Sequence, residues 1–166
     1  FDGLGEFCSF LEEQGVSGVI VSDIGVAEFI KSRTSLSIHV STQSSCLNTE
    51  AAHFWKELGA DRIIVGRELS IEQTKKIKET VGSAVEMFVH GAMCMAYSGH
   101  CVISNFTAGR DSNRGGCVQS CRNLYRLRSS DTLPVPAIKS EFSNFMSSKD
   151  MLGISYVPQF VDAKID

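Results

Sequence analysis

The sequence lacks any long apolar run. No hydrophobic stretch approaches the roughly 18 to 20 residues that a membrane-spanning helix needs, so we expect no membrane span. It also lacks a Met at position 1 and the basic, apolar, small-residue order of a signal peptide, so we interpret it as an internal fragment of a longer protein. Its formal net charge is only −3 at pH 7, so any contact with RNA has to come from a local patch.

Cysteine, by contrast, is plentiful and unevenly spread. The chain has 166 residues, 43% hydrophobic and 21% charged, which is the composition of one ordinary globular domain. Such a chain builds its own core, so its six cysteines favour a reduced, cytoplasmic setting over a disulfide framework. Cys8 and Cys46 stand apart from the others, and we expect them to be core thiols.

Short apolar runs alternate with helical patterns over the first 90 residues. The strands are expected at 19–21, 38–40, 62–65 and 85–89, and the helices at 4–14, 24–33, 48–59 and 70–81. Ser70 and Gln73 have the spacing of a capping box at the start of the last of these helices. The apolar runs show no polar alternation, which is typical of a parallel sheet covered by helices.

This alternation predicts an α/β fold. A repeat of about 20 to 25 residues favours a fragment of a (β/α)₈ TIM-like barrel with a cysteine-rich loop insertion, and a doubly wound domain is the alternative. We expect four β/α units over 1–90, the insertion over 91–140 and a return toward the barrel over 141–166, with a helix that has Pro158 in its first turn. A homodimer could cover the open sheet edges of an incomplete barrel.

Polar residues stand near the ends of the expected strands, where parallel α/β folds place their chemistry. His39 and Glu68 are the candidate catalytic residues, because an imidazole or carboxylate at a barrel rim suits acid–base work or ligand orientation. For Ser41 and Thr42, a functional role and a structural one, as helix caps and supports of the loop backbone, explain the sequence equally well.

Four cysteines lie where the alternation fails. Cys94, Cys101, Cys117 and Cys121 have the spacing Cys-x6-Cys-x15-Cys-x3-Cys, and no helix or strand of useful length is expected over 105–116. Four thiolates can hold an iron–sulfur cluster or a tetrahedral zinc ion, and the spacing leaves both open. Disulfides or one nucleophilic cysteine are further alternatives, although no partner for a nucleophile can be assigned from the sequence.

Arginines are interleaved with aromatic residues in the same segment. The predicted substrate-binding residues are Arg110, Arg114, Arg122, Arg126 and Tyr125, and Arg128 and Phe106 lie among them. Such a cationic surface could bind phosphates and stacked bases of an RNA. The alternative is a solvated loop face whose arginines offset nearby thiolate charge.

Several motifs resemble the collagenase-like peptidase family U32. The longest is Glu86-x-Phe88-x2-Gly91-Ala92-Met93-Cys94-x4-Gly99-x-Cys101-x-Ile103-Ser104. Further matches are His39-Val40-Ser41-Thr42-Gln43, Arg67-Glu68-Leu69-Ser70, Asn113-Arg114-Gly115-x-Cys117-x3-Cys121-Arg122 and Ser148-Lys149-Asp150. The resemblance covers nearly the whole chain, and members of the family are usually much longer.

The resemblance implies two functions. One is a secreted collagenase-like protease that acts on collagen or other protein substrates. The other is that of iron–sulfur proteins which add a hydroxyl group without molecular oxygen to a wobble uridine of tRNA, a ribosomal RNA cytidine or a quinone precursor, with prephenate as hydroxyl donor. The sequence contains no His-Glu-x-x-His, nucleophile elbow or aspartic dyad, so its residues favour an RNA base hydroxylase.

The resemblance also implies a ligand set for a four-iron four-sulfur cluster, namely Cys94, Cys101, Cys117 and Cys121, with zinc as the alternative metal. Some cluster-binding members have a cysteine shortly after Ser-Lys-Asp, whereas here Asp150 is followed by Met151 and Leu152. The fourth ligand is therefore Cys121 or is missing, which weakens the quinone-type function. A third interpretation is that the fragment alone has no activity.

Overall fold

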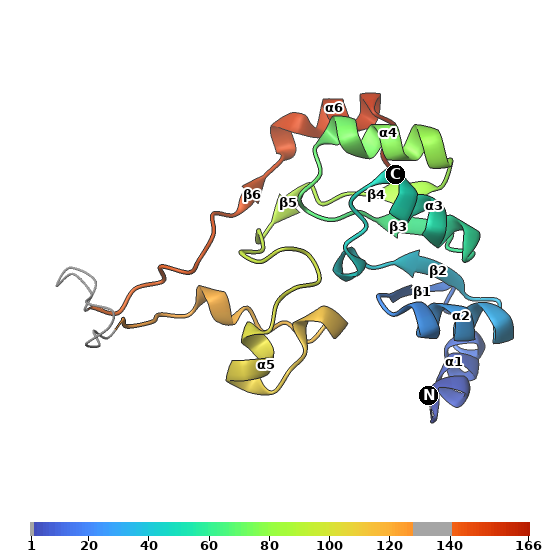
Figure 1. Ribbon diagram of the computed structural model, residues 1–166, viewed down its shortest axis with the longest axis horizontal. Coiled ribbons are helices and arrows are strands. Elements are labelled where there is room, and N and C mark those ends of the chain that lie inside the picture. The colour runs from blue at the N-terminus through green and yellow to red at the C-terminus, as the bar shows by residue number, and fades with distance from the viewer. Residues whose placement is uncertain (1, 128–140) are drawn as a thin grey trace.

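The first half of the chain folds as alternating helices and parallel strands. The computed structural model describes residues 2–127 and 141–166 (Figure 1), and Arg128 lies outside this range. The elements of this half are α1 (Leu4–Glu13), β1 (Gly18–Val21), α2 (Ile24–Arg33), β2 (Ser37–Val40), α3 (Thr49–Glu57), β3 (Arg62–Ile64), α4 (Ile71–Val81) and β4 (Ala84–Glu86).

The four strands form one parallel sheet in the order β1-β2-β3-β4. The register aligns Val21 with Val40, Val40 with Ile63 and Ile63 with Val85. The predicted parallel α/β fold is thereby confirmed. The predicted capping box is confirmed too, since Ser70 Oγ accepts from the Gln73 backbone N–H and Gln73 Oε1 from that of Ser70.

All four helices pack on the same face of the sheet. Alternate strand residues, among them Val40, Ile63 and Val85, share one buried cluster with Ala27 of α2, Ala52 of α3 and Ile77 of α4, and Cys8 of α1 belongs to it. The opposite face has no such helical cover among the described residues. Closure of a barrel stays a prediction.

Cys8 and Cys46 are core thiols, as expected. They are 1% and 0% exposed, and burial raises the pKa of the Cys46 thiol to about 11. A thiol with such a pKa is protonated at neutral pH and unreactive, so neither cysteine is a candidate for the site.

The second half of the chain departs from the sequence-based expectations in two places. The strand expected at 85–89 ends at Glu86, and the chain leaves the sheet so that β5 (His90–Gly91) pairs antiparallel with β6 (Met151–Leu152). A helix, α5 (Ile103–Ala108), lies partly within the segment expected to have none. It is short and contains residues of weak helix propensity, such as Thr107, whose hydroxyl bonds back to the Ile103 carbonyl.

Residues 151–166 return to the sheet. The expected helix is confirmed as α6 (Val157–Asp162), which follows a 3₁₀ turn at Ile154–Tyr156 and has Pro158 in its first turn. The backbone N–H of Asp166 donates to the Val85 carbonyl at 3.0 Å, which joins the end of the chain to β4. Within the described ranges, no helix is long and apolar enough to cross a membrane.

Candidate functional site at the carboxyl edge of the sheet

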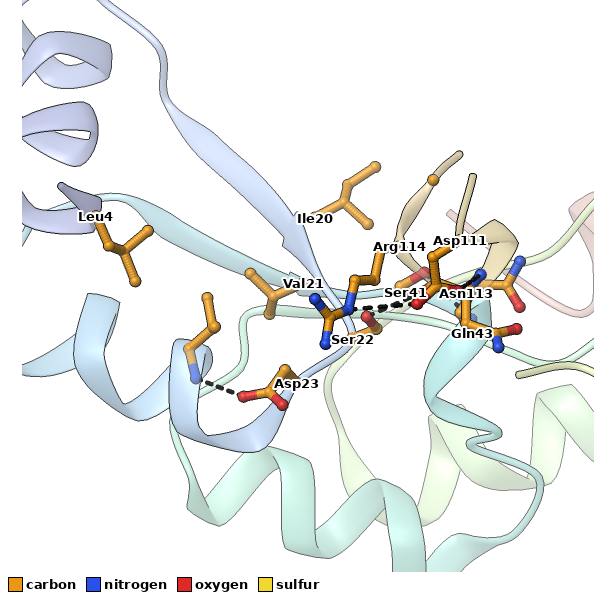
Figure 2. Close-up of a pocket in the computed structure, with 12 residues that line it drawn as sticks. Leu4, Ile20, Val21, Ser22, Asp23, Ser41, Gln43, Asp111, Asn113 and Arg114 are labelled. Atoms are coloured by element: carbon orange, nitrogen blue, oxygen red, sulfur yellow. Dashed lines mark hydrogen bonds and ion pairs between the residues drawn. The ribbon is translucent and has the colours of Figure 1, made fainter. Parts of the chain in front are cut away.

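A cavity of about 900 Å³ opens where β1 and β2 end (Figure 2). Its sheet side includes Ser22 and Asp23 after β1 and Ser41 and Gln43 after β2. Its other side is the turn at 111–115, which belongs to the cysteine-rich segment. The cavity therefore lies between the carboxyl edge of the sheet and the segment that carries the cysteines.

Asn113 connects this cavity to the cysteines. Its backbone carbonyl accepts a hydrogen bond from Ser22 Oγ at 3.3 Å, while its side-chain amide bonds the backbone N–H of Cys101 at 3.3 Å and the Cys101 carbonyl at 3.1 Å. Ser112 Oγ donates to the same carbonyl at 2.8 Å. The backbone of Cys101 is thus fixed directly behind the cavity wall.

A second connection holds the turn between Cys94 and Cys101. Glu68 Oε1 accepts from the Ser98 backbone N–H at 2.8 Å, and Gln43 Oε1 accepts from that of Gly99 at 2.9 Å. Gly99 has φ +81°, and a Cβ there would lie 2.3 Å from the Gln43 carbonyl oxygen. Only glycine fits this close approach without displacing the backbone.

The predicted catalytic residues lie apart in this arrangement. Glu68 anchors the turn at Ser98, and its second oxygen is 2.7 Å from the position that a Cβ on Gly66 would take. His39 lies within β2, in register with Ile20 and Arg62 on the sheet face opposite the helical core. Their catalytic role stays a prediction, because the hydrogen bond of Glu68 gives it a structural use and, within the described residues, His39 has no hydrogen bond or ion pair to the cysteine-rich segment.

The four predicted ligand cysteines are free thiols. Cys94, Cys101 and Cys121 are partly buried, and Cys117 is exposed. Cys117 Sγ accepts from the Gln119 backbone N–H at 3.4 Å and lies 4.0 Å from Ser104 Oγ. Hydrogen bonds of this kind to sulfur tune the reduction potential of a cluster when the sulfur is a metal ligand.

Burial and neighbouring charges both act on the pKa of one predicted ligand, Cys121. Burial raises the pKa of Cys121, Arg122 lowers it, and negative charge on Cys94 and Cys117 raises it again. Over the residues that the structure describes, however, no group of three or more His, Cys, Asp or Glu side chains has the geometry of a metal site. By its chemistry alone, a set of four thiols fits a soft metal or an iron–sulfur cluster, and the cofactor stays a prediction.

The predicted substrate-binding residues divide into two groups. Arg110, Arg114 and Arg126 are exposed, and the Arg114 side chain, 84% exposed, pairs with Asp111 at 3.4 Å at the cavity. Arg122 and Tyr125 are partly buried and engaged in structural contacts: Tyr125 Oη donates to the Ser120 carbonyl at 2.8 Å. Binding of substrate stays a prediction for all five.

Gln43 and Asn113 were not among the predicted site residues. Both stand inside motifs that resemble the family, which was the one available signal. Their function depends on hydrogen bonds to Gly99 and Cys101, which belong to other segments of the chain, and such pairings cannot be read from the sequence.

The site therefore defines a parallel α/β protein whose cysteine-rich segment is docked on the carboxyl edge of its sheet. The model of peptidase family U32 matches residues 1–166, and the chain belongs to this family. It is 42% identical to the tRNA hydroxylation protein P1 of Bacillus subtilis over 99% of this chain and 40% of that protein. It is 32% identical to a collagenase of Porphyromonas gingivalis over 90% of this chain and 38% of that protein.

A solved structure has the same fold. The structure described as that of the U32 peptidase Mk0906 matches 88% of this chain and 58% of that chain with a TM-score of 0.54 and 22% sequence identity. The chain spans about two fifths of the length of the two relatives named above, namely 40% and 38%. The activity of the whole protein is accordingly a matter for proposal.

Proposed function

We propose that the whole protein is an iron–sulfur-dependent, oxygen-independent RNA base hydroxylase that acts on a wobble uridine of tRNA in the cytoplasm. The observation that carries this proposal is the position of Asn113, which lines the strand-end cavity and holds the backbone of Cys101. A base that enters the cavity would therefore lie next to the segment that carries the cysteines. The name of the B. subtilis relative points to the same substrate class.

The exposed arginines supply the means of binding RNA. Arg110, Arg114 and Arg126 are solvent-accessible guanidinium groups on the cysteine-rich segment, and Arg114 reaches the cavity. Phosphate contacts of this kind position a nucleic acid, while Gln43 and Ser41 line the cavity, where their remaining hydrogen-bonding capacity could serve the edges of a base. These residues would orient the nucleotide.

Cys94, Cys101, Cys117 and Cys121 would hold the four-iron four-sulfur cluster. When bound, such a cluster supplies one-electron transfer chemistry. Zinc could bind the same four thiolates, but it has no redox chemistry and could not take part in an oxidation. Some cluster-binding members have a cysteine shortly after Ser-Lys-Asp, where this chain has Met151 and Leu152, so Cys121 is proposed as the fourth ligand.

The change at the base is a two-electron oxidation. A C–O bond forms with oxygen from a hydroxyl donor, for which prephenate is proposed: the donor's own C–O bond breaks, with loss of carbon dioxide and aromatisation of its ring, and releases the oxygen as hydroxide. The C–H hydrogen of the base leaves as a proton. Two electrons pass to an external electron acceptor. The residues of this chain would bind the base, hold it in place and screen it from solvent, and closure of the sheet into a TIM-like barrel by the rest of the protein would complete the screen.

The test is analysis of modified nucleosides. The whole protein is expressed in a bacterial strain that has no tRNA uridine hydroxylation of its own, and its tRNA is digested and examined by mass spectrometry. We expect hydroxylated uridine with the wild type and none with Cys117→Ser. Unmodified tRNA with a protein shown to carry its cofactor would contradict the proposed substrate.

A collagenase-like peptidase is the second candidate, and the P. gingivalis relative is the observation that favours it. It predicts cleavage of gelatin by the purified whole protein that persists after metal removal and in Cys117→Ser. Absence of cleavage, with hydroxylation present in the same preparation, would exclude it.

A further inference from the structure

One arginine of the cysteine-rich segment has both terminal nitrogens of its guanidinium group bonded to other parts of the chain. Arg122 Nη1 donates to Ser147 Oγ at 2.8 Å and to the Ser148 carbonyl at 2.6 Å. Its Nη2 donates to the Met93 carbonyl at 3.1 Å and to Asp150 Oδ1 at 2.8 Å. The Arg122 side chain is only 23% exposed, unlike that of Arg114, which is 84% exposed.

These bonds join two predicted ligands across a long separation in sequence. Arg122 directly follows Cys121, and the carbonyl that it binds belongs to the residue directly before Cys94. Ser148 Oγ donates to the same Met93 carbonyl, so the 147–150 segment closes the link from the other side.

We propose that Arg122 is a positioning residue that holds the Cys94 and Cys121 thiols facing each other, rather than a residue that binds substrate. This inference rests on the proposed function in its use of the thiols as cluster ligands. The positioning effect itself, in which one guanidinium fixes the spacing of two thiols, does not require a bound metal.

The chemistry requires arginine at this position. A guanidinium presents a rigid planar fork that bonds acceptors in several fixed directions, whereas a lysine ammonium is a single point at the end of a flexible stem. Lysine would keep the positive charge and the ion pair to Asp150, which is 69% exposed and contributes little. It could not bond the Met93 and Ser148 carbonyls together in the same geometry.

The first experiment uses the metal-free whole protein. Cys101 and Cys117 are replaced by serine, and dibromobimane, which becomes fluorescent when it bridges two nearby thiols, is added to bridge Cys94 and Cys121. We expect Arg122→Lys to reduce the rate of bridging several-fold. The matched control is Arg126→Lys, because Arg126 has no hydrogen bond or ion pair within the described part of the chain and should bridge like the parent.

The second experiment uses the protein with its native cysteines, purified without oxygen. Loss of a group that orients metal ligands typically lowers metal affinity about 10- to 100-fold, so Arg122→Lys should lose iron to a chelator at least about tenfold faster than Arg126→Lys. A shift in the reduction potential and visible spectrum of the remaining cluster is expected too, since charge and hydrogen bonds near sulfur set both. Far-ultraviolet circular dichroism should not change.

Unchanged bridging in Arg122→Lys would overturn the proposal whatever the metal content. A wild type without iron would contradict the proposed cofactor, and the bridging experiment would still decide the role of Arg122. If Arg122→Lys does not fold, Ser147→Ala serves instead, because it removes one acceptor of the guanidinium without a change of charge. The rate of bridging should then fall by a smaller factor, and an unchanged rate would refute the proposed role of Arg122.

Discussion

The two halves of the molecule bury different kinds of residue. In the sheet region most buried residues are apolar, among them Val40, Ile63 and Val85 at 0% exposure, although Thr74 is fully buried too. In the cysteine-rich segment the buried residues are serines: Ser98, Ser104, Ser112 and Ser120 are between 1% and 3% exposed, while Phe106 is 91% exposed. One region is held by hydrophobic packing, and the other by hydrogen bonds between side chains and backbone.

This difference indicates which part of the molecule would depend on a bound cofactor for its folded structure. Ser112 bonds the Cys101 carbonyl, Ser104 accepts from the Val118 backbone N–H, and Arg122 bonds the Met93 carbonyl, so polar side chains fix the backbone beside each predicted ligand. Net stabilisation by one hydrogen bond is only about 1 kcal/mol. We therefore expect the cysteine-rich segment to gain much of its order from a bound cofactor and the sheet to be stable without one.

The largest predicted effect is on the sheet. Ile63→Ala should lower the free energy of unfolding by about 2 to 5 kcal/mol, because it leaves a cavity at a position that is 0% exposed. Denaturant unfolding followed by circular dichroism measures it. Ile154→Ala is the matched control, since Ile154 is 72% exposed. Equal effects of the two substitutions would contradict the assignment of the core.

The next effect is at the junction of the two regions. Gly99→Ala places a methyl group 2.3 Å from the Gln43 carbonyl oxygen at φ +81°, so the turn has to move away from the sheet. We expect a cost of about 1 to 3 kcal/mol for this strain, visible as faster hydrogen exchange at residues 94–101 and not at β2 and β3. Gly109→Ala is the control for backbone strain alone, because φ there is +63° and no atom lies within 4 Å.

A smaller effect separates two roles of Glu68. If the carboxylate serves as an acceptor for the Ser98 N–H, Glu68→Ala should lower protection of that amide from exchange by about tenfold, and Glu68→Gln should retain most of it. If Glu68 is the predicted acid–base residue, Glu68→Gln should abolish hydroxylation while protection stays intact. Exchange and activity measured on both variants distinguish the two roles.

The smallest effect is a pH dependence confined to the sheet. Hydrogen bonds from Lys78 and then from the Val85 backbone N–H lower the pKa of Asp166. Because the folded pKa is the lower one, this group stabilises the fold above its unfolded pKa of about 4, and the contribution is lost as pH falls through the folded value. Asp166→Asn should reduce the fall in the free energy of unfolding between neutral and acidic pH. An unchanged fall would contradict the hydrogen bonds of Asp166 with Lys78 and Val85.

The sheet could be predicted from the sequence and much of the site could not. Apolar runs at 38–40 and 62–65 and the capping box at Ser70 are local patterns, and local patterns specified these elements. The helix α5 was missed because it is short and is held by buried polar contacts such as Thr107 with Ser120. The hydrogen bonds of Arg122 could not be predicted, because its partners Met93 and Ser148 lie far away in sequence.

Iron and acid-labile sulfide content, with the visible absorption spectrum, tests the central claim most directly. The whole protein is purified without oxygen beside Cys94→Ala and, as a control thiol from the core, Cys8→Ala. The account predicts about four irons and four sulfides per chain in the wild type and Cys8→Ala, and loss of both in Cys94→Ala. A wild type without iron, or iron content unchanged in Cys94→Ala, would contradict the assignment of these cysteines to a cluster.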